Sequence, residues 1–135
     1  MKVFKNMATL LAVTTAVAVN QTGNTYRIES NAEDGVKDHE QDFQVYFYGN
    51  QSGGASSPTS QMVLQTSPDN VNWYDVAEST ELTATGEKPE TKDVDGAPLL
   101  KYVRAKTVLG GGTNPNHTCE VRLVSNGSFR CKSVS

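Results

Sequence analysis

Residues 62–76, MVLQTSPDNVNWYDV, contain two short β-prone runs on either side of a compact turn signal. The first run, residues 62–67, begins with three apolar residues and contains Val and Thr, which favour strands. Residues 68–70 are Pro, Asp and Asn, which are typical of turns. The chain then resumes at residues 72–77 with aromatic and β-branched side chains. This pattern predicts an antiparallel hairpin within an all-β protein.

Similar runs recur along the whole chain, separated by segments rich in Gly, Pro, Asn and Ser. We expect strands from residue 9 onward and at residues 25–29, 43–48, 62–67, 72–77, 81–85, 99–108, 118–125 and 128–134. Residues 49–60 are expected to form a surface loop, and the Gly-, Pro- and acid-rich residues 86–98 an irregular excursion. No stretch has a helical period, so the spacing predicts an antiparallel β-sandwich or jelly roll of about eight or nine short strands.

The Asn-Gly pair at residues 126–127 is the strongest short hairpin signal in the chain. If the strands on either side of it pair directly, Cys131 lies opposite Arg122 and Cys119 lies opposite Val134. The two thiols then fall on opposite faces of the hairpin, where a disulfide has the wrong geometry. A bulge would change this register, so a disulfide between Cys119 and Cys131 is kept as the alternative. Reduced thiols fit a protein that stays in the cytosol until it assembles.

Residues 1–19 admit two interpretations. A basic start, an apolar middle and Ala-Val-Ala at residues 16–18 resemble a secretory signal. However, threonines interrupt the apolar stretch, and their alternation with Val and Ala fits a half-buried strand. We expect a retained strand behind a short leading arm. The predicted organisation is an N-terminal arm at residues 1–7 and a single β-sandwich domain at residues 8–135.

Composition and motifs exclude several functions. The 135 residues carry a net charge of −3, which provides no positive electrostatic field to attract the phosphates of nucleic acid. Two Cys and two His are too few for a usual zinc site. His39 lies among acidic residues whose spacing misses the calcium pattern, and residues 93–96 are interpreted as a turn. His117 is expected in the lead-in to a strand, without an acidic partner. We therefore expect a protein that is not an enzyme, with no catalytic, cofactor-binding or metal-binding residues, no cofactor and no membrane partner. The acidic residues around His39 are Asp34, Asp38, Glu40 and Asp42.

Four aromatic residues, Trp73, Tyr74, Tyr46 and Tyr48, also have two interpretations. They could form a platform for a sugar ring. The favoured alternative makes Trp73 the main core aromatic, with one or two of the tyrosines facing solvent or a neighbouring subunit.

Residues 62–76 resemble a "strand, Ser-x-Asp-Gly-x-x-Trp, strand" hairpin that recurs in small β-sandwich proteins of tailed-bacteriophage virions. Residues 101–105, KYVRA, resemble the "Tyr-Val-Arg" strand that often follows it. The start at residues 7–9 and the first strand, rich in Thr, Val and Ala, are similar in character. The chain departs from this pattern at Asn70, where Gly is commoner, but Asn tolerates the same left-handed turn. Similar hairpins occur in carbohydrate-binding and immunoglobulin-like modules.

Within that class the resemblance implies a capsid decoration (cement) protein. Such a protein is a homo-oligomer, with a trimer favoured, and it stabilises the shell by bridging subunits of the major capsid protein. The implied location is the capsid surface of the virion, after synthesis in the host cytoplasm. The arm is expected to lie across the partner. Its residues are Met1, Lys2, Val3, Phe4, Lys5 and Asn6.

Three alternatives remain from the sequence. One is a carbohydrate-binding β-sandwich module that uses Trp73 and Tyr74. Another is a tail or baseplate component of the virion, which differs from a decoration protein in copy number. The third is a secreted, glycosylated β-sandwich.

Overall fold

The structure, a computed structural model, describes residues 3–17, 20–30, 42–52, 59–83, 86–94, 99–110 and 116–134. These residues form nine β-strands and no helix. The strands are β1 (Asn6–Val17), β2 (Tyr26–Ser30), β3 (Phe43–Ser52), β4 (Thr59–Ser67), β5 (Tyr74–Glu78), β6 (Gly86–Asp93), β7 (Tyr102–Gly110), β8 (Asn116–Ser125) and β9 (Phe129–Ser133). They build a four-stranded sheet in the order β1-β8-β3-β6 and a five-stranded sheet in the order β5-β4-β7-β2-β9.

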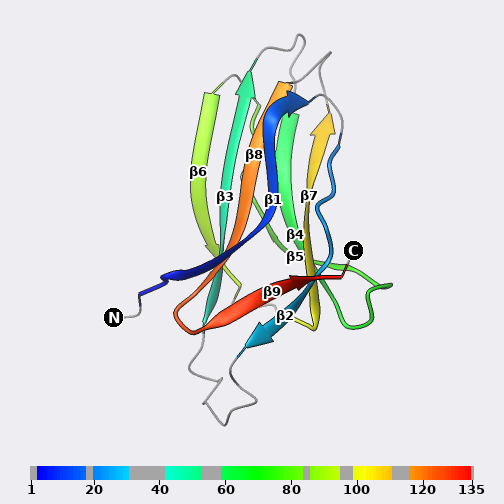
Figure 1. Cartoon of the computed structure of the whole chain (residues 1–135). Helices are drawn as coiled ribbons and strands as arrows, with labels where there is room; N and C mark the ends of the chain where they lie inside the picture. The colour runs from blue at the N-terminus through cyan, green and yellow to red at the C-terminus, as the bar shows by residue number, and fades with distance from the viewer. Residues whose placement is uncertain are drawn as a thin grey trace.

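The strand order is that of a jelly roll with one added strand. β1 pairs with β8, β2 with β7, β3 with β6 and β4 with β5, all antiparallel. The first four strands are thus matched, in reverse order, by the next four, and this nested ribbon is rolled into two facing sheets. In Figure 1, β6, β3, β8 and β1 run side by side, and β9 and β2 lie at the lower end. The predicted antiparallel β-sandwich is confirmed.

Alternating side chains fill the space between the sheets. Val45 and Phe47 of β3 are fully buried, and so are Val121 and Leu123 of β8. The facing sheet contributes a second set of buried side chains, which are Met62, Leu64, Val103 and Ala105. Burial of one such large apolar side chain contributes about 1.5–3 kcal/mol. The alternation of residues 43–48 along the strand therefore points Val45 and Phe47 into the core.

The predicted hairpin at Asn126-Gly127 is wrong. β8 lies between β1 and β3, so both of its edges are occupied, and β9 pairs with β2 in the other sheet. Residues 126–128 instead cross between the sheets. The Asp42 N–H donates to Asn126 Oδ1 at 2.7 Å, and Asn6 Nδ2 donates to the Gly127 carbonyl at 2.9 Å. Cys119 and Cys131 are therefore in different sheets, and both are free thiols.

Other elements also differ from the expectation. Strands β3 and β4 extend into the expected loop at residues 49–60, as far as Ser52 and from Thr59. Residues 86–93 form strand β6, which pairs along its length with β3, instead of an irregular excursion. β6 is an edge strand, and an edge accepts Pro89 and a run of charges because one side of its backbone needs no partner. β1 begins at Asn6, which pairs with Ser125, so the sheet includes the last two residues assigned to the arm.

Candidate functional site

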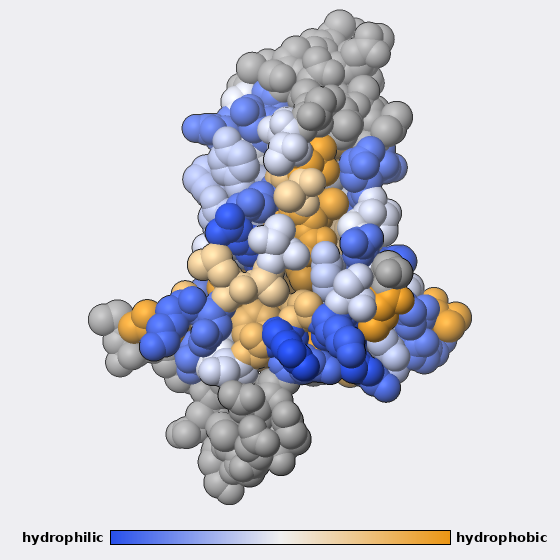
Figure 2. All heavy atoms as spheres, viewed as in Figure 1, coloured by the Kyte–Doolittle hydropathy of each residue, from blue (hydrophilic) through white to orange (hydrophobic). Residues whose placement is uncertain are grey.

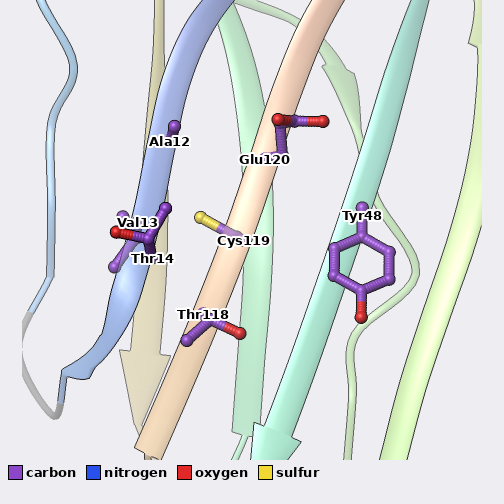
Figure 3. A pocket seen from close by; sticks show the side chains of 7 residues that line it. All are labelled: Ala12, Val13, Thr14, Tyr48, Thr118, Cys119 and Glu120. Carbon is purple, nitrogen blue, oxygen red and sulfur yellow. The ribbon is translucent and has the colours of Figure 1, made fainter.

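The outer face of the four-stranded sheet carries two shallow hollows that meet at Glu120. The register of the sheet aligns Thr9, Arg122, Tyr46 and Thr91 in one cross-strand row. The larger hollow, of about 470 Å³, is lined by Phe4, Met7, Gln44, Tyr46, Thr91, Glu120, Arg122 and Val124. The smaller one, of about 320 Å³, is lined by Ala12, Val13, Thr14, Tyr48, Thr118, Cys119 and Glu120. Figure 3 shows that the side chains of the smaller hollow come from β1, β8 and β3.

Arg122, Glu120 and Glu87 on this face each have a partner among the neighbouring side chains. Arg122 forms a two-pronged ion pair with Glu120, with Nε–Oε1 at 2.8 Å and Nη2–Oε2 at 3.1 Å. Arg122 Nη1 also lies 3.1 Å from the Met7 sulfur. The Tyr48 hydroxyl donates to Glu87, and this hydrogen bond raises the pKa of Tyr48. The face can therefore offer aromatic and apolar contact area without leaving these charges unpaired, which suits protein binding.

The predicted arm residues differ from one another in exposure and in the contacts that they make. Val3 is 63% exposed, and Lys5 is exposed as well. Phe4 is partly buried and lines the larger hollow. Asn6 belongs to β1 and helps to hold residue 127. Met1 and Lys2 lie outside the described residues.

This face was not among the predicted sites, although the sequence contains the signal for it. Tyr46 and Tyr48 alternate with the buried Val45 and Phe47, so the period-two pattern already put the two tyrosines on the outer face of the sheet. Their neighbours Met7, Val124 and Arg122 come from other parts of the sequence. Only the pairing of β3 and β1 with β8 brings these side chains together.

Trp73 is not the main core aromatic, which corrects the favoured interpretation. It is partly buried just before β5, and the Arg104 guanidinium lies 4.2 Å from its ring centroid. Arg104 Nε donates to Gln65 Oε1, and Gln65 Nε2 donates to Asp75 Oδ1, both at 2.8 Å. The fully buried aromatic of the core is Phe47. Arg104 thus covers part of the indole surface that a sugar would need.

The four aromatic residues also do not share one surface. Tyr74 is 56% exposed in β5 of the five-stranded sheet. Tyr46 and Tyr48 are partly buried on β3 of the four-stranded sheet. A single platform made of Trp73 and all three tyrosines is therefore absent.

The turn before Trp73 has the predicted conformation and a dense hydrogen-bond network. Asn70 adopts φ of 63°, as expected for a residue that replaces Gly there. Asp69 Oδ1 accepts the N–H groups of Val71 and Asn72 at 2.9 and 2.8 Å. These bonds to the charged form lower the pKa of Asp69 to about 2. The result is a well-supported turn that presents Val71 at 75% exposure.

The other candidate chemical groups form no site in the described residues. His117 lies within β8 and is fully buried, so the expected loop position is wrong. Asp93 accepts a hydrogen bond from Gln44 Nε2 at 2.7 Å. Among the residues that the structure describes, no three His, Cys, Asp or Glu side chains are grouped to hold a metal. In the same residues, no helix has the length and apolarity to cross a membrane. His39 and three of its acidic neighbours, Asp34, Asp38 and Glu40, lie outside the described residues.

Comparisons with known proteins found distant similarity to solved structures and no match by sequence. No protein-family model matches the chain, and no curated protein matches its sequence. Among solved structures, a structure of the infectious bursal disease virus Gx strain aligns with 92% of this chain at 10% sequence identity and a TM-score of 0.43. The chain spans 27% of the length of that viral protein.

Proposed function

We propose that this chain is a structural protein of a virus particle that binds the outside of a tailed-phage capsid as a decoration protein. The observation that carries the proposal is the jelly-roll order of the strands, β1-β8-β3-β6 facing β5-β4-β7-β2. That architecture is used by viral capsid proteins and by lectins. The resemblance of residues 62–76 to a virion hairpin is strengthened by Asn70, which has the backbone conformation that the missing Gly would supply.

The state of Trp73 favours the virion role over the lectin role. A sugar ring stacks on an open aromatic face. Here Arg104 lies over the indole ring and is itself held by Gln65. A sugar that stacked on this face of the ring would first have to displace Arg104 and break both contacts.

The proposed partner is the major capsid protein, bound by the arm and by the adjoining outer face of the four-stranded sheet. Phe4 and Met7 supply apolar area beside the ring of Tyr46. Val3 and Met7 are more than half exposed, so a partner would cover apolar surface that water now contacts. Each contact is modest, and repetition over many copies on one shell adds avidity. This is a binding role that requires no catalytic step.

The first test is the copy number of the chain in purified particles from its source, measured by quantitative mass spectrometry against the most abundant shell protein. We expect a ratio near one, or a simple fraction of it. A few copies per particle would assign the chain to the tail or baseplate. Absence from particles would overturn a virion role, and binding of Trp73 variants to a glycan array would then be measured.

The second test locates the contact. Deletion of residues 1–5 leaves β1 whole, because Asn6 is its first residue. We expect this deletion and Phe4→Ala to weaken attachment to shells by roughly tenfold or more, as for a buried aromatic anchor. Val71→Ala is the matched control, since it removes an exposed apolar side chain from the β4–β5 turn. Equal attachment of all variants would show that the arm is not the contact.

A further inference from the structure

The two sheets have four edge strands, and three of these are protected against pairing with another chain. β6 contains Pro89 and five charged side chains, which are Glu87, Lys88, Glu90, Lys92 and Asp93. β5 and β9 have only five residues each, and each carries two charges. Proline, charge and short length are the usual means by which proteins prevent edge-to-edge association.

β1 has none of these protections. It spans 12 residues, Asn6–Val17, without a proline or a charged side chain, and five of them are Thr or Val. In the described part of the chain, β1 pairs with β8 on one side and with no strand on the other. Figure 2 shows apolar side chains in a column along the middle of the molecule, where Figure 1 places β1. The edge is not uniform, because the register with β8 shifts at Leu10 and again between Val13 and Val17, and a bulge is itself a partial protection. At Leu10 the carbonyl also lies against Gly23. Regular pairing with β8 extends over residues 6–9 and 11–13, and these two stretches are the part of the edge that a second strand can extend.

We propose that the open edge of β1 is a dimer interface, at which β1 of a second copy adds in antiparallel orientation about a two-fold axis. The two four-stranded sheets would then form one continuous sheet. Unpaired N–H and C=O groups along an edge supply the main-chain hydrogen bonds for such strand addition. A two-fold contact needs only that β1 be compatible with itself.

The absence of charge is what favours a second copy over a foreign strand. In an antiparallel β1–β1 pair, uncharged residues meet uncharged residues, so no like charges face each other. Selection of a foreign strand generally uses complementary charges at the interface. The β1 edge offers none, whereas every other edge strand of the fold carries charges.

The test is the oligomeric state of the full chain, measured by sedimentation across a wide concentration range, together with hydrogen exchange of residues 6–17. We expect a monomer–dimer equilibrium in which the β1 amides become protected as the dimer forms. A chain that stays monomeric would overturn the proposal. The dimer departs from the trimer that the resemblance of the sequence favours, so a trimer would overturn the proposal in favour of that expectation. A dimer in which β1 gains no protection would also overturn it.

Charged substitutions on the two edges of the same sheet provide a matched comparison. Ala12→Lys is the main variant, because Ala12 is exposed and a longer side chain there extends into solvent without entering the core. Thr9→Lys is the second variant, and Thr91→Lys on β6 is the control at the other end of its cross-strand row. We expect both β1 variants to weaken dimerisation by roughly tenfold or more, and Thr91→Lys to leave it unchanged.

An equal effect of all three substitutions, or no effect of any, would contradict β1 pairing. The outcome is separable from that of the proposed function. A chain that is monomeric but still attaches to shells would contradict only the dimer proposal. A chain that dimerises through β1 but is absent from particles would contradict only the proposed capsid role.

Discussion

The Leu10 carbonyl oxygen lies so close to Gly23 that a Cβ atom on residue 23 would stand 2.5 Å from it. Leu10 is the extra residue of the β1 bulge, where the register with β8 shifts between Thr9 and Leu11. The Gly23 N–H donates to the Ala105 carbonyl at 2.8 Å, which ties the segment before β2 to β7. The two sheets therefore approach at the β1 side through a backbone contact that leaves no room for a side chain.

Gly23→Ala is expected to destabilise the fold by about 1–3 kcal/mol, as for overpacking against atoms that cannot swing away. The free energy of unfolding in urea measures this effect. Gly110→Ala is the control, because among the described residues its new Cβ would meet only Thr59 Oγ1, at 3.4 Å. If Gly23→Ala lowered the free energy of unfolding no more than Gly110→Ala does, the backbone around Leu10 would have moved to accommodate the new methyl group.

Arg104→Ala should both destabilise the chain and change the fluorescence of Trp73. The variant removes the guanidinium from the indole ring, a contact that contributes about 0.5–2 kcal/mol. It also removes the donor to Gln65 Oε1. Because more of the ring meets water, the emission should move to longer wavelength.

Arg130→Ala is the control for loss of an arginine, since Arg130 is 77% exposed and pairs with Glu29 on the surface. Such a pair contributes about 0–1 kcal/mol. Unchanged Trp73 emission in Arg104→Ala would show that the stacked arrangement does not persist in solution.

Local patterns in the sequence were sufficient for most strands and for one turn. Alternating residues in the sequence separate the two faces of β3 and β7, and the Ser-Pro-Asp-Asn turn before Trp73 has Asn70 in the left-handed region. These features depend on neighbours within a few residues. The choice of strand partner depends on residues far apart in the sequence, and the predictions of strand pairing were less successful.

Two errors show what local signals omit. Asn126-Gly127 favours a tight hairpin, but β1 and β3 occupy both edges of β8, so the chain has to leave the sheet. Trp73 looked like a core residue because large aromatics are generally buried, yet Arg104, 31 positions away, covers it on the outer side. The outer face around Tyr46 likewise depends on strand order, which composition and spacing do not determine.

The two thiols should react slowly in the folded protein. Burial raises the pKa of both Cys119 and Cys131 to about 11, so little thiolate exists near neutral pH. A colorimetric thiol reagent at pH 8 should label both residues slowly in buffer and rapidly in denaturant. Cys119→Ala and Cys131→Ala each report the rate of the remaining thiol. Rapid labelling of either thiol in buffer would contradict its burial.

The unfolding free energy should fall as the pH is lowered below about 6.5, because of His117. This side chain is fully buried, and neither ring nitrogen has a hydrogen-bond partner among the described residues. Burial lowers the pKa of His117 from its ordinary value of 6.5. In acid the unfolded chain therefore binds a proton that the folded chain resists. Stability is retained above pH 6.5 and is lost progressively down to the folded-state pKa.

His117→Leu removes the titrating group and should flatten this part of the profile, and His39→Gln, which removes the other histidine, should leave it in place. At pH 8, His117→Leu should also be no less stable than the parent, since it replaces an unpartnered polar ring with apolar volume among Met62 and Leu82, which approach residue 49 beside His117. Chemical denaturation of the three proteins between pH 5 and 8 measures both effects. If His39→Gln removed the pH dependence of the unfolding free energy and His117→Leu did not, His39 would be its cause. A strongly destabilised His117→Leu would mean that the imidazole nitrogens of His117 have hydrogen-bond partners in solution.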